Sequence, residues 1–410
     1  MRIPDADLAG KQVLVTGGTG FIGGRLVERL VLDCNANVRV LVSSVGNLSR
    51  IARLPIDIVQ GDVTTAGDAE RAAAGCDIIF HCAYGNKGSE KERRRITVQG
   101  TENVLTAARK AASKRVVHVS TMMVYGKAAD SQLDETAARR YMRDWYPDSK
   151  IDAEKLVFDH IRDRAVPATV VQPTVVYGPY SPPFTVGVLN RLKRKRIILV
   201  DGGDGLCNAV YIDDLVTGML LAAVKDEAVG EAFLISGEAP VTWREFFAKF
   251  EEMLGVHGTV SMSAPEARAF YRQTEREKWA VRQLLKMVSE LTNRPRVRKR
   301  VERFPLGRTV VRLGERLAGR RSPPGNDKPI HPLLPYQIDF YQAKTHVRID
   351  KAKRLLGYQP AFDLEAGMAL TERWAEWANL LYRGYTHSGG PRVDGSADKV
   401  ERHHTVLQRL

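Results

Sequence analysis

Short runs of β-branched and apolar residues alternate with helix-like segments between Gln12 and about Ala83. The runs are QVLVTGG, NVRVLVS, IDIVQGD and CDIIFHCA, and the helix-like segment GRLVERLVL separates the first two. Such unbroken apolar runs are typical of strands that are buried on both faces. Their alternation with helices is the pattern of a parallel sheet covered on both sides. The sequence therefore predicts an α/β fold with a doubly wound parallel sheet.

The alternation continues to Tyr177, and a different pattern follows. A helix is expected from Ser149 to about Arg164, followed by the strand-like run ATVVQPTVVYG. The next segment is rich in proline and includes the basic run LNRLKRKR, which we expect to be helical; CNAVYIDDLVTGMLLAAV and AFLISG then return to the sheet pattern. From TWREFFAKFEEMLG the chain is expected to be mainly helical up to about Trp377. We therefore predict two domains and a tail: a sheet domain of residues 8–180, completed by 207–237, a smaller and mostly helical cap of residues 181–206 and 238–385, and a loose tail, 386–410.

The length of 410 residues is sufficient for a sheet domain with a cap. The four cysteines lie far apart, form no CxxC pair and have no histidines at metal-ligand spacing, which predicts a reduced compartment and no metal site. The first residues contain no apolar signal core, and no stretch approaches the roughly 20 apolar residues that span a bilayer. These features predict a cytoplasmic protein.

Three glycines lie at GxxGxxG spacing between the first strand and the first helix of the predicted sheet. They are Gly17, Gly20 and Gly23 in VLVTGGTGFIGGRLVERL. Glycines at such a turn let the backbone approach a pyrophosphate, which then lies at the helix N-terminus. A turn that binds nothing is the alternative, but the flanking strand and helix favour a dinucleotide site, as in a Rossmann fold.

The choice between NAD and NADP depends on the end of the second strand, where an acidic residue holds the ribose hydroxyls and a basic one favours a 2′-phosphate. Here the strand ends in VLVSS. Ser43 and Ser44 can hydrogen-bond either group, with assistance from Arg50, so both cofactors stay open. Asp62, in QGDV after the third strand, is equally consistent with an adenine contact and with a helix N-cap.

A tyrosine and a lysine four residues apart occur in YPDSK, and their place in the chain order gives them meaning. The order is the glycine loop, GDV, HCAY, VHVSTMMVYG, YPDSK and QPTVVYGP. This order resembles that of the extended short-chain dehydrogenase/reductase family, which includes nucleotide-sugar epimerases and dehydratases. The resemblance covers roughly residues 11–237 and resumes at RIDKAKRLLGYQPAFDLEAGMALTERWAEW.

The resemblance implies a catalytic set of Thr121, Tyr146 and Lys150. A tyrosinate can accept the hydroxyl proton of a secondary alcohol if its pKa falls toward neutrality, and a neighbouring ammonium is expected to lower it. Residues i and i+4 share a helix face, so Lys150 is expected near Tyr146. For the cofactor, the resemblance implies contacts from Gly17, Gly20, Phe21, Ile22, Gly23, Ser43, Asp62, Val63, Cys82, Ala83, Tyr146, Lys150, Pro173 and Val176.

Departures from the family pattern bear on the substrate, for which we select Tyr84, Met122 and Asn208. Sugar dehydratases carry Asp-Glu after the catalytic threonine, whereas Met122 and Met123 cannot act as acid or base. Nucleotide-sugar members place an arginine where Asn208 stands. The leading hypothesis is an NAD(P)-dependent epimerase or oxidoreductase acting on a secondary alcohol of a sugar or nucleotide-sugar. A hydroxysteroid- or lipid-type alcohol dehydrogenase at a membrane surface is the second, and a non-catalytic dinucleotide-binding protein is the third.

The basic charge of the chain is concentrated in the insertion 266–328. It holds 18 Lys and Arg against 7 Asp and Glu, a net +11 of the total +14. Apolar residues at helical spacing from Val281 to Leu291, and arginines every four residues from Arg308 to Arg320, predict amphipathic helices. Such helices are either solvated or lie on an anionic membrane, so peripheral membrane contact through 281–321 stays open. Phe304 is the sole aromatic residue between Arg294 and Arg321, which argues against nucleic-acid binding. Many members of the family pair as homodimers, and the expected partner is a small-molecule substrate.

Overall fold

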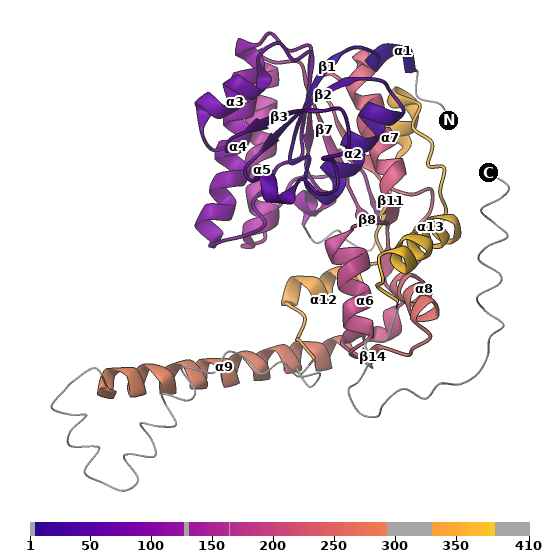
Figure 1. Cartoon of the computed structure of the whole chain (residues 1–410). Coiled ribbons are helices and arrows are strands. Elements are labelled where there is room, and N and C mark those ends of the chain that lie inside the picture. The colour runs from indigo at the N-terminus through magenta and orange to yellow at the C-terminus, as the bar shows by residue number, and fades with distance from the viewer. Residues whose placement is uncertain (1–4, 127–130, 164, 293–329, 382–410) are drawn as a thin grey trace, which may run out of the picture.

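Seven parallel strands form the central sheet of the computed structural model, which describes residues 5–126, 131–163, 165–292 and 330–381 (Figure 1). The strand order is β12-β7-β5-β4-β1-β2-β3. The strands are β1 (Gln12–Thr16), β2 (Asn37–Val42), β3 (Asp57–Gln60), β4 (Ile78–His81), β5 (Arg115–Val119), β7 (Ala168–Pro173) and β12 (Ala232–Ile235). The chain reverses its direction across the sheet between β3 and β4, which opens a crevice between the carboxyl ends of β1 and β4. The predicted doubly wound α/β fold is confirmed.

Two separate apolar cores lie on the two faces of the sheet, because successive side chains of a strand point to opposite faces. Val13 and Val15 of β1 pack with α2 (Phe21–Leu32) and α7 (Ile212–Val224). Leu14, between them, packs into the other core, with residues of α3 (Ala66–Ala73), α4 (Glu90–Lys110) and α5 (Trp145–Arg162). Figure 1 shows these two helix layers on either side of the sheet.

A smaller lobe lies beyond the carboxyl edge of the sheet, below it in Figure 1. Its strands β9 (Ile197–Val200) and β14 (Thr259–Met262) pair in parallel, a pairing within the region expected to be helical. The buried indole of Trp243 packs among aromatic rings that include Phe247 and Tyr341. The helices of the lobe are α6 (Gly187–Leu192), α8 (Trp243–Leu254), α9 (Ala264–Thr292), α12 (Pro335–Gln342) and α13 (Leu364–Trp377).

Three two-stranded pairings connect the sheet with the lobe and close the site between them. β8 (Val175–Tyr177) pairs with β11 (Ala209–Tyr211), β10 (Leu206–Cys207) with β13 (Val241–Thr242), and β6 (Gln132–Leu133) with β15 (His346–Val347). The predicted basic helix LNRLKRKR is shorter than expected, since α6 ends at Leu192. A short helix, α1 (Asp5–Leu8), precedes the sheet.

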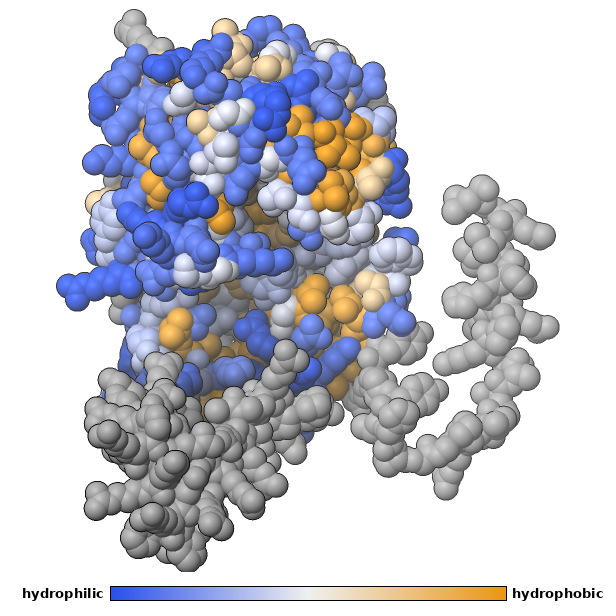
Figure 2. Space-filling model, turned by 60° about the vertical axis from the view of Figure 1, so that its left-hand side comes forward, coloured by the Kyte–Doolittle hydropathy of each residue, from blue (hydrophilic) through white to orange (hydrophobic). Residues whose placement is uncertain are grey.

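Helix α9 projects away from the lobe (Figure 1) and leads into the basic insertion. Residues 293–329 lie outside the described residues, and so do most side chains of 281–292. The predicted helix from Val281 to Leu291 forms the last part of α9. Its amphipathic face, the predicted helix from Arg308 to Arg320, the membrane contact through 281–321 and the tail 386–410 lie outside the described residues. Within the described part, no helix has the length and apolarity required to cross a membrane. Figure 2 shows one face of the molecule as mainly hydrophilic, with separate apolar areas.

Candidate active site

The glycine loop brings β1, β4 and α2 into backbone contact. Gly17 has a φ of +70°, and a Cβ atom there would lie 2.7 Å from the backbone nitrogen of Ala83. A Cβ atom at Gly23 would lie 2.3 Å from the carbonyl oxygen of Gly17. Gly20 is the N-cap of α2. Side chains are therefore sterically excluded at Gly17 and Gly23, and the N-terminus of α2 opens toward the crevice.

A cavity of about 540 Å³ occupies this crevice, a size suited to a small-molecule ligand. Its wall includes seven of the residues expected to contact a cofactor, namely Gly17, Gly20, Ser43, Asp62, Val63, Cys82 and Ala83, together with Tyr84. Other expected contacts lie around it rather than in its wall: Phe21, Ile22 and Gly23 in the first turn of α2, Pro173 at the end of β7, and Val176 in β8. The residues present fit a dinucleotide laid across the carboxyl ends of β1, β2 and β4.

Asp62 lies in the turn before α3 and is not the helix N-cap, one of the two roles that the sequence left open. Its Oδ1 atom accepts a hydrogen bond of 2.8 Å from the backbone N–H of Thr64, so the carboxylate stabilises the turn before α3. The helix N-cap itself is Thr65. Because Asp62 also lines the cavity, the turn presents this residue to a bound ligand.

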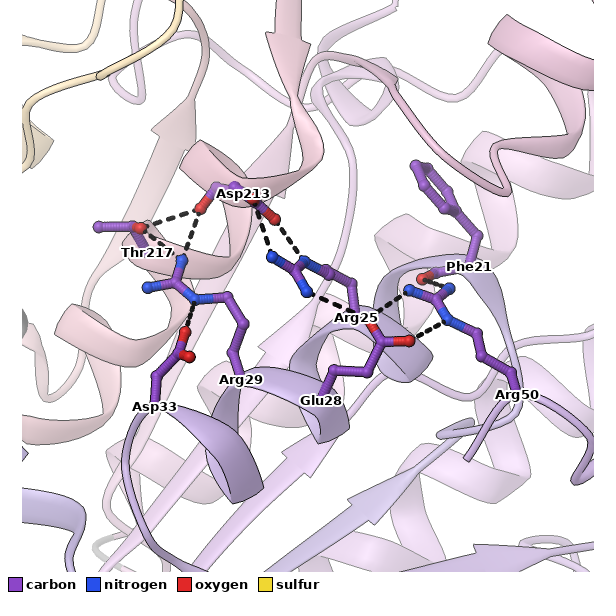
Figure 3. A network of polar contacts seen from close by, with 8 residues as sticks. All are labelled: Phe21, Arg25, Glu28, Arg29, Asp33, Arg50, Asp213 and Thr217. Carbon is purple, nitrogen blue, oxygen red and sulfur yellow. Dashed lines mark hydrogen bonds and ion pairs between the residues drawn. The ribbon is translucent and has the colours of Figure 1, made fainter. Parts of the chain in front are cut away.

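Arg50 is committed to the fold and does not face the ribose position. Its guanidinium forms two hydrogen bonds with Glu28, of 2.7 and 3.0 Å, and a third with the carbonyl oxygen of Phe21 (Figure 3). Glu28 is also paired with Arg25, which binds Asp213 at the start of α7. The suggested assistance of Arg50 at a 2′-phosphate is therefore wrong. Ser43, in the cavity wall, stays available for a ribose hydroxyl.

Helix α5 begins at Trp145, four residues earlier than the sequence suggested, and so includes Tyr146 in its first turn. The Asp144 carboxylate accepts a hydrogen bond of 2.9 Å from the backbone N–H of Tyr146 and caps the helix. Pro147 is tolerated there because the first turn needs no backbone donor. The earlier start places Tyr146 and Lys150 on one helix, one turn apart.

Lys150 is almost completely buried. Its ammonium donates a hydrogen bond of 2.8 Å to the carbonyl oxygen of Val119 at the end of β5. Burial lowers the pKa of Lys150 to about 8, although Cys82 and Glu154 act in the opposite direction. Glu154, also buried, is bound by Arg139 and by the side-chain amide of Gln172.

The pKa of Tyr146 is raised to about 12, mainly by burial and further by Tyr84. A hydrogen bond with the side chain of Thr121 acts to lower this pKa but does not offset burial. The expectation that Lys150 holds the Tyr146 pKa near neutrality is therefore wrong for this state of the site. Desolvation of a phenolate outweighs its attraction to polar neighbours here. At neutral pH the phenol carries its proton.

Aromatic rings surround Tyr146 on the cavity side. The Tyr84 ring meets it edge to face at 6.0 Å between centroids, and the Trp145 ring does so at 5.7 Å. The Lys150 ammonium lies 5.3 Å from the centroid of Tyr84, within cation–π range. Arg93 of α4 covers the Trp145 ring. Trp145 and Arg93 were not selected from the sequence, because their contact joins α4 and α5, which pack together but are far apart in the sequence.

Two buried histidines support the loop that carries Cys82 and Ala83. His81 lies between the hydroxyls of Thr16 and Thr101, at 2.7 and 3.0 Å. Thr101 donates its own proton to the carbonyl of Thr97, so it accepts from Nε2–H of His81, and Nδ1 of the neutral imidazole can then accept from the Thr16 hydroxyl. Burial lowers the pKa of His81 to about 3. His118, its neighbour on β5, is also buried and has a pKa well below its usual value.

A second, narrower pocket of about 60 Å³ begins at Met122, the residue that follows Thr121. Met122 and Asn208, both expected to contact substrate, lie in its wall. The cap contributes Tyr336 and Phe340 from α12, and neither was selected from the sequence. No local motif indicates them, because α12 reaches the site only through tertiary packing. The other residues that line the pocket are Met123, Gly126, Met142, Leu206, Asp339, Ala343 and Thr345.

Comparisons with known proteins agree with this geometry. Residues 13–236, more than half of the chain, match the model of the NAD dependent epimerase/dehydratase family. A 4-hydroxy-2-methyl-3-oxo-4-farnesyl-3,4-dihydroquinoline-1-oxide ketoreductase of Stigmatella aurantiaca is 32% identical over 266 residues, or 63% of this chain and 78% of that protein. A 3 beta-hydroxysteroid dehydrogenase/Delta 5-->4-isomerase of Mycobacterium tuberculosis is 27% identical over 93% of this chain and 94% of its own.

Solved structures show the same fold. An epimerase of Methanothermobacter thermautotrophicus superposes with a TM-score of 0.65 at 19% identity, covering 92% of this chain and 95% of its own. The expected resemblance is confirmed by the family model and by the sequence relatives, and so is the enzyme class. The chain belongs to the NAD dependent epimerase/dehydratase family, within the extended short-chain dehydrogenases/reductases.

Proposed function

We propose that this protein is an NAD-dependent oxidoreductase that interconverts a secondary alcohol and a ketone in a mainly apolar molecule. The observation that carries the proposal is the narrow pocket beside Thr121, whose wall includes three methionines, Met122, Met123 and Met142. Thioethers and aromatic rings favour apolar groups and adapt to their shape. This is the second of the alternatives that the sequence left open, and the pocket favours it over a sugar or nucleotide-sugar.

The polar side chains Asn208 and Asp339 of this pocket already form hydrogen bonds or ion pairs within the protein. The Asn208 amide donates to the carbonyl oxygen of Thr345 at 2.9 Å and accepts from the backbone N–H of Val347 at 2.9 Å. Asp339 is paired with Arg268. Sugar hydroxyls placed here would lose hydrogen bonds to water without replacement, at about 1–3 kcal/mol for each buried group. The selected role of Asn208 is therefore better understood as joining β11 to β15 behind the pocket.

The relatives point in the same direction. One is named for a ketone that bears a farnesyl chain, and another for a hydroxysteroid. Both names describe apolar molecules that react at a secondary alcohol or ketone carbon. The narrow pocket receives the few atoms around that carbon, and the rest of a larger substrate extends outside it.

The arrangement of Thr121, Tyr146 and Lys150 supports carbonyl reduction at neutral pH. The cleft lined by Gly17 and Gly20 would hold the reduced NAD cofactor, which would supply the hydride for the carbonyl carbon. Tyr146, which holds its proton, then donates that proton to the carbonyl oxygen, and the Thr121 hydroxyl holds the same oxygen. The new C–H and O–H bonds convert the ketone into the alcohol. Lys150, which donates a hydrogen bond to the carbonyl oxygen of Val119, would bind a ribose hydroxyl of the cofactor.

A panel of probes tests the substrate class. The protein is mixed with NADH and either 2-decanone, ethyl 3-oxodecanoate or a 3-oxosteroid, and with UDP-glucose and UDP-galactose in the absence of added cofactor. We expect NADH oxidation with at least one apolar ketone and no interconversion of the sugars. Met122→Asp should lower kcat/KM for that ketone at least tenfold, whereas Met122→Leu keeps it within about threefold. Sugar epimerisation without ketone reduction would refute the proposal.

Identification of the bound nucleotide separates the remaining alternatives. We would denature the purified protein and examine the released nucleotide by mass spectrometry. An exchangeable cofactor supports a reductase or dehydrogenase, whereas tightly held NAD that survives purification supports an epimerase that recycles its own hydride. The third alternative, a non-catalytic binding protein, is disfavoured because the chain keeps Thr121, Tyr146 and Lys150, and the Thr121 side chain hydrogen-bonds Tyr146.

A further inference from the structure

The cap helix α12 is fixed so that one of its side chains, Tyr336, faces the narrow pocket. Ile338 is fully buried in a core that includes Ile198 of β9. Asp339 and Gln342 are both held by Arg268 of α9, and Gln342 also donates a hydrogen bond of 2.7 Å to Asp201. These contacts hold both the inner face and the end of the helix. The position of Tyr336 is therefore set by the lobe as a whole.

Tyr336 lines the narrow pocket, whereas Tyr84 lines the large cleft. Tyr336 contributes to the electrostatic surroundings of Tyr146. Asp144, the N-cap of α5, contributes in turn to the electrostatic surroundings of Tyr336. Burial and Asp144 raise the pKa of Tyr336 to about 12, so its hydroxyl carries a proton at neutral pH. Tyr336 is thus a neutral hydrogen-bond donor near the reacting centre.

The hydroxyl of Tyr336 differs from the other polar side chains of the pocket in being uncommitted. Asn208 is bonded to Thr345 and Val347, and Asp339 is bound by Arg268. Among the described residues, none forms a hydrogen bond with the Tyr336 hydroxyl. A half-buried phenol that faces an apolar pocket loses hydration when substrate enters, unless the substrate supplies an acceptor.

We propose that Tyr336 is a specificity-determining residue, which donates its hydroxyl proton to a second oxygen that the substrate carries close to the reacting carbon. This inference rests on the proposed function and goes beyond it by adding one polar requirement to an otherwise apolar substrate. A neighbouring carbonyl or carboxylate oxygen of the substrate would accept a hydrogen bond from the Tyr336 hydroxyl. A substrate without that oxygen leaves it unpaired, and sites of this kind discriminate strongly.

Two probes that differ in the second oxygen test the inference. Ethyl 3-oxodecanoate carries an ester oxygen two carbons from its ketone, whereas 2-decanone carries none. We expect Tyr336→Phe to lower kcat/KM for the keto ester about tenfold and to leave that for 2-decanone within about twofold. Tyr180→Phe, which changes a partly exposed tyrosine that packs on Trp374 outside the pocket, is the matched control and should change neither value.

The ratio of the two kcat/KM values distinguishes recognition from a structural role. If Tyr336→Phe lowers both values equally, or neither, the inference is overturned while the proposed function stands. If the parent protein reduces neither probe nor a 3-oxosteroid, the proposed function fails and the inference fails with it. Unchanged NADH binding by the variant, measured by fluorescence titration, confirms that the cleft is intact.

Discussion

The rings of Tyr84 and Tyr146 meet edge to face, with their centroids 6.0 Å apart. Tyr84 lines the large cleft and Tyr336 lines the narrow pocket, and both contribute to the electrostatic surroundings of Tyr146, so residues of both spaces lie near its phenol. A phenol in this place can exchange a proton with a substrate in one space while a hydride crosses from the other. Tyr84 was selected from the sequence as a substrate residue, and in the structure it lines the cofactor cleft and also contacts Tyr146.

Tyr146→Phe should lower kcat by about 10²–10⁴-fold, because it removes the proton donor without changing the shape of the site. The Kd for NADH, measured by fluorescence titration, should stay within about twofold, since the cleft is lined by other residues. Tyr141→Phe is a suitable control, because Tyr141 is exposed and hydrogen-bonds Asp152. Near-normal turnover by Tyr146→Phe would refute the role proposed for this residue.

Gly17→Ala should abolish cofactor binding and lower the free energy of unfolding by about 1–3 kcal/mol, because a left-handed residue gains a Cβ atom that clashes with the backbone of Ala83. Gly46→Ala offers a matched comparison in the same cleft: its Cβ atom would meet only Ser44 Oγ, at 3.6 Å. NADH titration and urea denaturation measure both effects. Equal losses from the two variants would contradict a specific role for the Gly17 turn.

Acidification should destabilise the protein through His81 and His118. Both have a folded-state pKa below their usual value, because burial disfavours the charged imidazole. The unfolded chain takes up protons below about pH 6.5 while the folded imidazoles stay neutral, so stability falls as pH decreases through this value. At pH 5.5 the loss is on the order of 1 kcal/mol for each histidine.

His118→Leu isolates one half of this effect. In the part of the chain that the structure describes, neither ring nitrogen of His118 has a hydrogen-bond partner, so an apolar side chain of similar volume should be tolerated at pH 7.5. Urea denaturation at pH 7.5 and 5.5 should show that the variant loses less stability than the parent, by on the order of 1 kcal/mol. The same acid-induced loss in both proteins would show that His118 is charged in the folded state.

Arg50→Gln should destabilise the fold without changing the choice of cofactor. The substitution removes both hydrogen bonds to Glu28, at an expected cost of about 1–3 kcal/mol in partly buried surroundings. The ratio of the Kd values for NADH and NADPH should stay within about twofold, since Arg50 points toward α2. Ser43→Ala, in the cleft wall, should weaken NADH binding instead. A selective loss of NADPH affinity in Arg50→Gln would contradict this assignment.

The sequence by itself determined the sheet and the place of the cofactor cleft. Unbroken apolar runs such as QVLVT can be buried on both faces only in a covered parallel sheet, and the spacing of Gly17, Gly20 and Gly23 reflects a steric limit within a few residues of chain. The pairing of Tyr146 with Lys150 follows from helical periodicity in the same way. Local periodicity and local sterics were sufficient for these features.

Tertiary structure alone decided the chemistry that surrounds them. The pKa of Tyr146 is raised because burial outweighs its neighbours, and burial depends on packing from distant segments. The amide of Asn208 hydrogen-bonds the backbone of Thr345 and Val347, and the guanidinium of Arg50 pairs with Glu28. The sequence alone does not indicate these partners. Tyr336 enters the site only because Arg268 and the β9 core hold α12 in place. Pairings between residues so far apart in the chain leave no periodic signal, because they arise from the three-dimensional packing of the lobe against the sheet.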